Sequence, residues 1–166
     1  EIMKAETYKA RLKFLQENSI STADDLTACM QRAENAVTQL AKQRTILNVR
    51  KKKRRKLFDA LAAEEALAMS KDLYEEGLSG MESEYAQYVE AKATLDTCDI
   101  SRQALTEEKA DIYEQLAQLN KQIRAERKKI KLCREIADSA AKMQQDIAVQ
   151  EKSQQEKEAS KTRDYK

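Results

Sequence analysis

Seven consecutive basic residues are the most distinctive chemical feature of this 166-residue sequence. Lysine and arginine side chains bind phosphate groups, and each phosphate that they neutralise on a nucleic acid releases a counterion. Contacts of this kind give affinity and orientation without reading the base sequence. We therefore predict that this segment, called the basic run below, binds the phosphate backbone of DNA. Its members are Arg50, Lys51, Lys52, Lys53, Arg54, Arg55 and Lys56.

The basic run has two other interpretations. It could be a helical face that is solvated or that pairs with acidic residues of the same chain, as is usual for charges on coiled coils. It could also contact an anionic membrane surface. We favour nucleic acid among the three. Because seven residues fill about two helical turns, only three or four of them could face one partner.

A second basic cluster lies in residues 121–134, where seven lysines and arginines stand against the single Glu126. We predict Lys128 and Lys129 in this cluster as secondary phosphate contacts. Charged residues interleaved with apolar ones are also ordinary flanks of a coiled coil, so this cluster has a strong structural interpretation. Acidic residues predominate in residues 72–90 and 107–114, and the net charge is only +2. Separated charge of this kind suits an anionic partner at some surfaces and not at others.

The sequence argues against catalysis. It contains no histidine, the commonest general base and metal ligand, and no glycine-rich phosphate loop. The cysteines Cys29, Cys98 and Cys133 have neither zinc-site nor disulfide-framework spacing, so we expect reduced thiols in a cytoplasmic protein. We predict no enzyme activity, no cofactor, no metal and no small-molecule ligand. No apolar stretch reaches the roughly 18–20 residues of a membrane span, so no membrane partner is expected.

The composition predicts helices. There is no proline, glycine occurs only at Gly77 and Gly80, and charged residues make up 36% of the chain. We predict an all-α fold, an elongated antiparallel coiled coil or helical bundle of about four helices, two of them long. One module would span residues 1–149, followed by a frayed or disordered polar tail over 150–166. The predicted helices cover about 1–17, 22–76, 81–97 and 106–149.

Apolar residues recur at alternating spacings of three and four in both long helices, which predicts their packed faces. Ser21 or Thr22 is predicted to cap the second helix and Thr106 the last one. In the second helix the packed positions are Leu26, Met30, Ala33, Val37, Leu40 and Leu47. In the last helix they are Ile112, Leu116, Leu119, Ile123, Ile130, Cys133, Ala137, Ala140 and Ile147.

The same spacing places two residues of the basic run, Lys51 and Arg54, on the packed face of the second helix. Like charges four residues apart repel each other. We therefore expect this stretch to be solvated, bent, or offset by an anionic partner.

A faint internal repeat relates the two halves of the chain. An offset of 80 residues aligns four identical pairs, which predicts a short helix, an Ile-Ser turn and a long helix in each half. Any two helical hairpins share some register, so chance similarity is the other interpretation. The pairs are Tyr8 and Tyr88, Leu15 and Leu95, Ile20 and Ile100, and Ser21 and Ser101.

Three segments resemble a known family. Residues 6–17 (ETYKARLKFLQE), 20–26 (ISTADDL) and 123–129 (IRAERKK) look like the helical region that follows the nuclease domain of mobilisation relaxases. These relaxases belong to plasmids and integrative conjugative elements of Gram-positive gut bacteria, and the similarity spans about residues 5–137. It implies a parent protein that nicks one DNA strand at a transfer origin, using a tyrosine nucleophile and a histidine-bound metal.

Because this chain has no histidine, it cannot contain that nicking centre. We expect a non-catalytic helical domain of a DNA mobilisation relaxase that assists transfer by sequence-independent backbone binding. The alternative is a structural coiled-coil module that self-associates or recruits transfer-machinery proteins and has no DNA contact. In that case exposed apolar residues such as Ile112, Leu116 and Ile123 would drive dimerisation. A coiled coil of a filament or secretion apparatus is a third interpretation.

Overall fold

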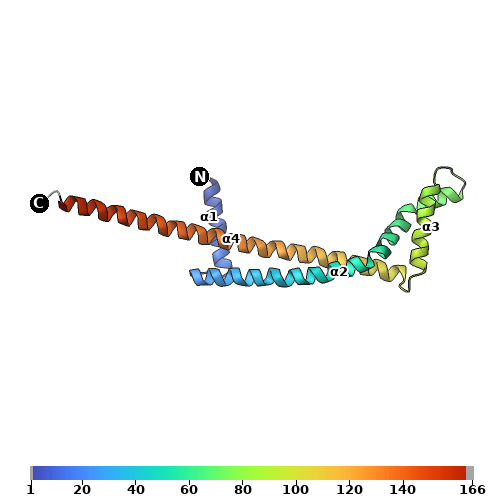
Figure 1. The fold of residues 1–166 in the computed structure, drawn as a ribbon, viewed down its shortest axis with the longest axis horizontal. Coiled ribbons are helices and arrows are strands. Elements are labelled where there is room, and N and C mark those ends of the chain that lie inside the picture. The colour runs from blue at the N-terminus through green and yellow to red at the C-terminus, as the bar shows by residue number, and fades with distance from the viewer. Residues whose placement is uncertain (1, 164–166) are drawn as a thin grey trace. The chain divides into compact units, whose positions relative to one another are not determined.

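The computed structural model describes residues 2–163, and this part of the chain is all-α (Figure 1). It contains four helices and no strand, as the sequence predicts. The two long helices, α2 and α4, have 53 and 62 residues. The coiled-coil form of their packing stays a prediction. The helices are α1 (Ile2–Glu17), α2 (Ala23–Glu75), α3 (Glu82–Asp96) and α4 (Arg102–Arg163).

The start of α2 is fixed by a reciprocal cap. The Asp25 N–H donates to Thr22 Oγ1 at 3.1 Å, and Asp25 Oδ2 accepts the N–H groups of Ser21 and Thr22, both at 3.0 Å. The N–H of Ser21 and then that of Thr22 hold the pKa of Asp25 below its usual value, because they favour the charged carboxylate. The predicted cap at Thr22 is therefore confirmed.

The start of α4 differs from the prediction. Ser101 is the cap, since its Oγ accepts the N–H of Ala104 at 3.1 Å, and the helix begins at Arg102. Thr106, the predicted cap, lies inside the helix and donates its hydroxyl to the Arg102 carbonyl at 2.8 Å. Threonine bonds equally well to a carbonyl one turn back, so its presence did not mark a helix end.

The end of α4 also differs, because the helix continues to Arg163 rather than ending near residue 149. Glutamate, lysine and glutamine predominate beyond residue 149, and these residues form helix without an apolar stripe. Side chains from 137 to 160 are all exposed, so the prediction that Ala137, Ala140 and Ile147 lie on the packed face is wrong. Fraying of this tail in solution stays a prediction, and its last residues, 164–166, lie outside the described part.

The chain divides into two compact units, Glu1–Thr38 with Ile123–Lys166, and Gln39–Gln122. Each unit contains one short helix, the first part of the long helix that follows it, and the last part of the other long helix. This common order of elements agrees with the 80-residue offset. Chance similarity of two helical hairpins stays the other interpretation of the repeat.

The first unit has its own small core. Phe14 of α1 and Cys29 of α2 pack with Cys133 of α4, and six partly buried apolar side chains surround them. Two polar contacts support this packing. Arg11 Nη1 donates to Ser139 Oγ at 3.0 Å, and Arg134 Nη2 lies 3.4 Å from Glu34 Oε1.

Two cysteines that are distant in sequence meet in this core. Cys29 and Cys133 are both buried, and no disulfide joins them. Burial, followed by the neighbouring Cys29 thiol, raises the pKa of Cys133 to about 11. The thiol is therefore neutral at physiological pH and behaves as a small apolar side chain.

The second unit contains the larger core, formed by α2, α3 and α4. Figure 1 shows α3 beside the last part of α2, and the stacked rings of Tyr74 and Tyr85, 4.2 Å apart, join these two helices. The buried side chains are Leu47, Phe58, Ala60, Ala91, Leu95, Leu105, Ile112, Leu116 and Leu119.

Polar contacts show that α2 and α4 run antiparallel in this unit. Proceeding along α2, Arg44 contacts Asn120, Arg54 contacts Glu108 and Glu64 contacts Arg102. The Glu64 contact is bidentate, with two N···O distances of 2.7 Å, and Arg102 also binds Asp96 at 2.8 Å. Glu64, and after it Asp96, raises the pKa of Arg102 by pairing with its guanidinium group. Arg102 in turn lowers the pKa of Asp96.

The expectation that Ile112, Leu116 and Ile123 are exposed is wrong. Their exposed fractions are 0%, 8% and 1%. Helices of the same chain cover them; Ile112 and Leu116 belong to the core of the second unit.

None of the helices within residues 2–163 combines the length and the apolar character of a membrane span.

Leu116→Asp is expected to unfold the second unit rather than to separate a dimer, because it buries a charge in the core. Circular dichroism should show lost helicity and a lower melting temperature. Ile46→Asp is the matched control, since Ile46 is 63% exposed on the same helix pair, and it should melt like the wild type. A Leu116→Asp variant with wild-type melting would contradict this core assignment.

The burial of two thiols predicts their reactivity. In the folded chain a disulfide reagent should modify half-buried Cys98 first, while Cys29 and Cys133 should react only as fast as the first unit opens. Timed thiol counting, with a denatured sample as reference, measures this. Cys98→Ser should remove the fast phase; three equally fast thiols would contradict the packing.

Candidate nucleic-acid interface

The whole basic run lies in α2, within the second unit, and its side chains divide into three groups. The first group faces Glu108 of α4. Arg54 Nε lies 3.2 Å from Glu108 Oε2, and Arg50 Nη2 lies 3.4 Å from Oε1. Only 20% of the Glu108 side chain is exposed, so water screens these pairs incompletely. One carboxylate of the same chain therefore pairs with two of the seven cations and offsets one of their two positive charges.

The second group surrounds a pocket of about 380 Å³. Lys51, Lys52 and Arg55 contribute three positive charges to its lining, and Asp59 contributes one negative charge, which leaves +2. Arg55 Nε lies 3.9 Å from Asp59 Oδ2, and both side chains are at least 75% exposed, so this pair is weak. The remaining lining residues are Asn48, Phe58 and Tyr113. We call this site the Tyr113 pocket.

The Tyr113 ring is the partner of Lys51. Lys51 Nζ lies 4.5 Å from the ring centroid, a cation–π distance. Lys51 and Arg54 are both half-buried against α4, which confirms their predicted place on the packed face of α2.

The third group consists of Lys53 and Lys56, which are exposed like Lys52. In the described part of the chain, no hydrogen bond or ion pair engages any of these three lysines. Positions 52, 53 and 56 lie on one side of a helix, because position 56 follows position 52 by four residues and position 53 by three. Their ammonium groups are therefore available to a partner outside the chain.

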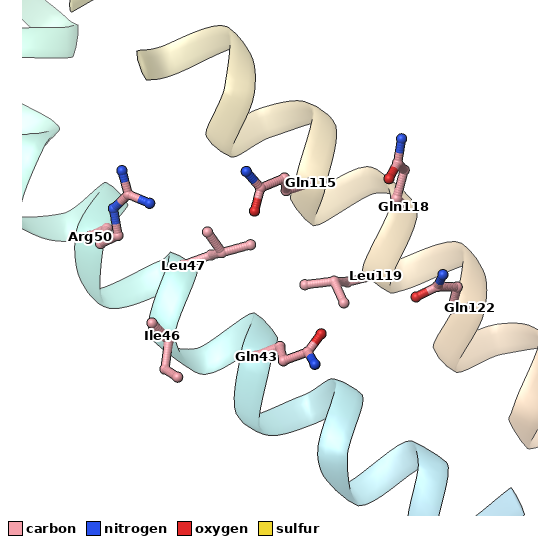
Figure 2. A pocket seen from close by; sticks show the side chains of 8 residues that line it. All are labelled: Gln43, Ile46, Leu47, Arg50, Gln115, Gln118, Leu119 and Gln122. Atoms are coloured by element: carbon pink, nitrogen blue, oxygen red, sulfur yellow. The ribbon is translucent and has the colours of Figure 1, made fainter.

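A groove of about 480 Å³ lies between α2 and α4 beside the run (Figure 2). Leu47 and Leu119 point toward each other across it, and Arg50 is its only charged lining residue. Four glutamines also line the groove, and their amide groups can donate and accept hydrogen bonds but carry no charge to neutralise a phosphate. The groove therefore has little of the electrostatic character of the Tyr113 pocket. The other lining residues are Gln43, Ile46, Gln115, Gln118 and Gln122.

The predicted secondary contacts belong to the first unit. Lys128 is exposed, whereas Lys129 Nζ bonds Glu126 Oε1 at 3.1 Å. Elsewhere in this cluster Lys131 pairs with Glu135 at 3.9 Å, and Arg134 with Glu34. Neither Lys128 nor Lys129 lines the Tyr113 pocket. Three of the seven basic residues of this cluster thus form ordinary ion pairs along and between helices. Among the described residues the other four have no hydrogen bond or ion pair and are exposed: Lys121, Arg124, Arg127 and Lys128.

Tyr113 was not identified from the sequence as a residue of the candidate site. It is 47% exposed, and Tyr8 is 69% exposed. One signal was present, because Tyr113 directly follows the buried Ile112 and so lies off the packed face. Its proximity to Lys51 depends on how α2 and α4 align, which the sequence alone does not show.

The site offers binding groups rather than a metal centre. The described residues contain no group of three or more Cys, Asp or Glu side chains placed to hold a metal ion. No protein-family model, curated protein or solved structure matches the chain. The resemblance to the helical region of relaxases therefore stays a prediction.

Glu108→Gln should destabilise the chain by about 1 kcal/mol at low salt, because Arg50 and Arg54 then repel each other without a counter-charge. Added salt should narrow the gap to the wild type, since it screens this repulsion. Urea unfolding at low and high salt measures both effects. Glu107→Gln is the matched control at the exposed neighbouring position. Equal stability of the two variants at low salt would contradict the role given to Glu108.

Proposed function

We propose that this chain is a non-catalytic domain that binds the phosphate backbone of DNA through the basic run, independently of base sequence. The observation that carries the proposal is the division of the run. Only Arg50 and Arg54 pair with Glu108, whereas Lys52, Lys53 and Lys56 have no partner among the described residues. A run that only stabilised the fold would not need these three charges.

The biological setting rests on a separate argument. Residues 6–17, 20–26 and 123–129 resemble the helical region of mobilisation relaxases, so we propose that the DNA is that of a transferring element. In a relaxase, a sequence-independent grip would hold the strand while a separate nuclease domain selects and cuts it. Such a division of labour fits phosphate contacts, which position a protein without specifying a base.

The alternative of a self-associating structural module required an exposed apolar surface at Ile112, Leu116 and Ile123. These three residues are buried and cannot form that surface. Self-association or protein recruitment would have to use other apolar residues, such as the exposed Met143, Ile147 and Val149 of α4. The DNA proposal relies instead on three exposed lysines, Lys52, Lys53 and Lys56, that have no hydrogen bond or ion pair among residues 2–163. We therefore rank it first.

The combined variant Lys52→Glu, Lys53→Glu and Lys56→Glu should bind DNA at least about tenfold more weakly, by a similar factor for every sequence tested. It should also lower the slope of log affinity against log salt by up to about 3, one for each lost phosphate contact. Fluorescence anisotropy with labelled duplexes across a salt series measures both. Arg50, Lys51 and Arg54 are left intact because they also hold α2 against α4.

The control carries the same change of charge elsewhere, as Lys9→Glu, Lys142→Glu and Lys152→Glu at exposed positions of α1 and α4. It should keep most of the wild-type affinity. Equal weakening in both variants would mean that only total charge matters. Unchanged binding in the first variant, or a wild type that binds no DNA at low salt, would refute the proposed function.

A further inference from the structure

Tyr113 is the most accessible aromatic ring beside the basic run. It projects from α4 next to the fully buried Ile112, so the backbone that carries it is fixed by the core. The residue is 47% exposed, and its ring is not stacked on another aromatic ring, unlike the rings of Tyr74 and Tyr85. A flat, accessible ring on a rigid helix can stack with a nucleic-acid base of any identity.

Three cations line the same pocket as the Tyr113 ring. Lys51 Nζ lies 4.5 Å from the ring centroid. When a nucleotide binds, this ammonium group can leave the ring and pair with a phosphate oxygen instead. Lys52 and Arg55 line the same pocket, and Asp59 is the only anionic group there. The net charge of +2 favours an anionic ligand.

The pocket also has the size and mixed lining of a site for part of an organic molecule. Its volume of about 380 Å³ falls within the roughly 300–1,000 Å³ of small-molecule sites. Phe58, only 4% exposed, gives it an apolar lining, and the Asn48 amide can donate and accept hydrogen bonds. An inorganic phosphate or a lipid headgroup would use the cations and leave the ring idle. A nucleotide uses both.

Strand pairing decides which nucleotides can enter. In a duplex, both faces of a base are covered by its neighbours, and exposing one costs unpairing and unstacking energy. A base in a single strand can turn outward at much lower cost. The stacking contact therefore distinguishes a single strand from a duplex, whereas the phosphate contacts alone do not.

We propose that the Tyr113 pocket binds one unpaired nucleotide of a DNA strand, with its phosphate at Lys51, Lys52 and Arg55 and its base stacked on Tyr113. The domain would then prefer single-stranded DNA over duplex. This inference rests on the proposed backbone binding and adds a strand preference to it. It also gives a functional role to the aromatic ring that faces the run.

The test compares a labelled thymidine oligonucleotide with a labelled duplex of equal length, by anisotropy, using the full chain. Tyr113→Leu should weaken single-strand binding by on the order of tenfold and should change duplex binding little. Tyr113→Phe should bind like the wild type, because it keeps the ring. Tyr8→Leu is the matched control, since Tyr8 is an exposed tyrosine of α1 outside the pocket.

A second readout observes the stack directly. The fluorescence of a purine analogue in a single strand should be quenched by the wild type and by Tyr113→Phe. Tyr113→Leu should quench it less. Thermal melting of each variant shows whether it is folded. If Tyr113→Leu fails to fold, the wild type alone provides the test. Quenching of the analogue in the single strand but not in a duplex of the same sequence supports the pocket, and no quenching in the single strand overturns it.

The outcomes separate this inference from the proposed function. Binding of single strand and duplex by the wild type, with no loss or an equal loss on both in Tyr113→Leu, overturns the nucleotide pocket and leaves backbone binding intact. Absence of binding to either DNA at low salt overturns both. A single-strand preference that is lost in Tyr113→Leu and kept in Tyr113→Phe supports the pocket.

Discussion

The pairing of α2 with α4 in the second unit depends on how the charge on the packed face of α2 is offset. Arg54 and Lys51 occupy positions that an ordinary helix pair would fill with apolar side chains. Two residues of α4 make this possible, since Glu108 pairs with Arg50 and Arg54 and Tyr113 receives Lys51. With these contacts the apolar packing resumes at Phe58, so the core extends on both sides of the charged turn.

Local rules predicted much of the fold. The absence of proline and the alternating apolar spacings predicted the four helices, and the Thr22 cap followed from residue type and position. The errors arose where a local signal has two uses. Thr106 bonds a carbonyl inside α4 instead of capping it, and the polar residues beyond 149 form helix without packing. Residue preferences alone do not separate these cases.

The candidate site was predictable in its charges and not in its geometry. Seven adjacent cations are visible in the sequence, and helical spacing placed Lys51 and Arg54 on the packed face. The partners of Arg50, Lys51 and Arg54 are Glu108 and Tyr113, more than 50 residues away in the chain. Their positions follow from the antiparallel alignment of α2 and α4, whose register is marked by contacts such as Glu64 with Arg102. These contacts were not readable from either helix separately.

The unneutralised part of the run is the strongest argument for a partner. Lys52, Lys53 and Lys56 repel one another on one side of α2, and acidic residues are plentiful elsewhere, as at Glu75 and Glu76 near the end of the same helix. An interspersed charge pattern would stabilise α2 better. Positions where a sequence departs from the locally most stable choice tend to be functional, because selection there acts on binding as well as on folding. A polyanion supplies the missing counter-charge, and among polyanions a DNA strand also supplies a base for the ring of Tyr113.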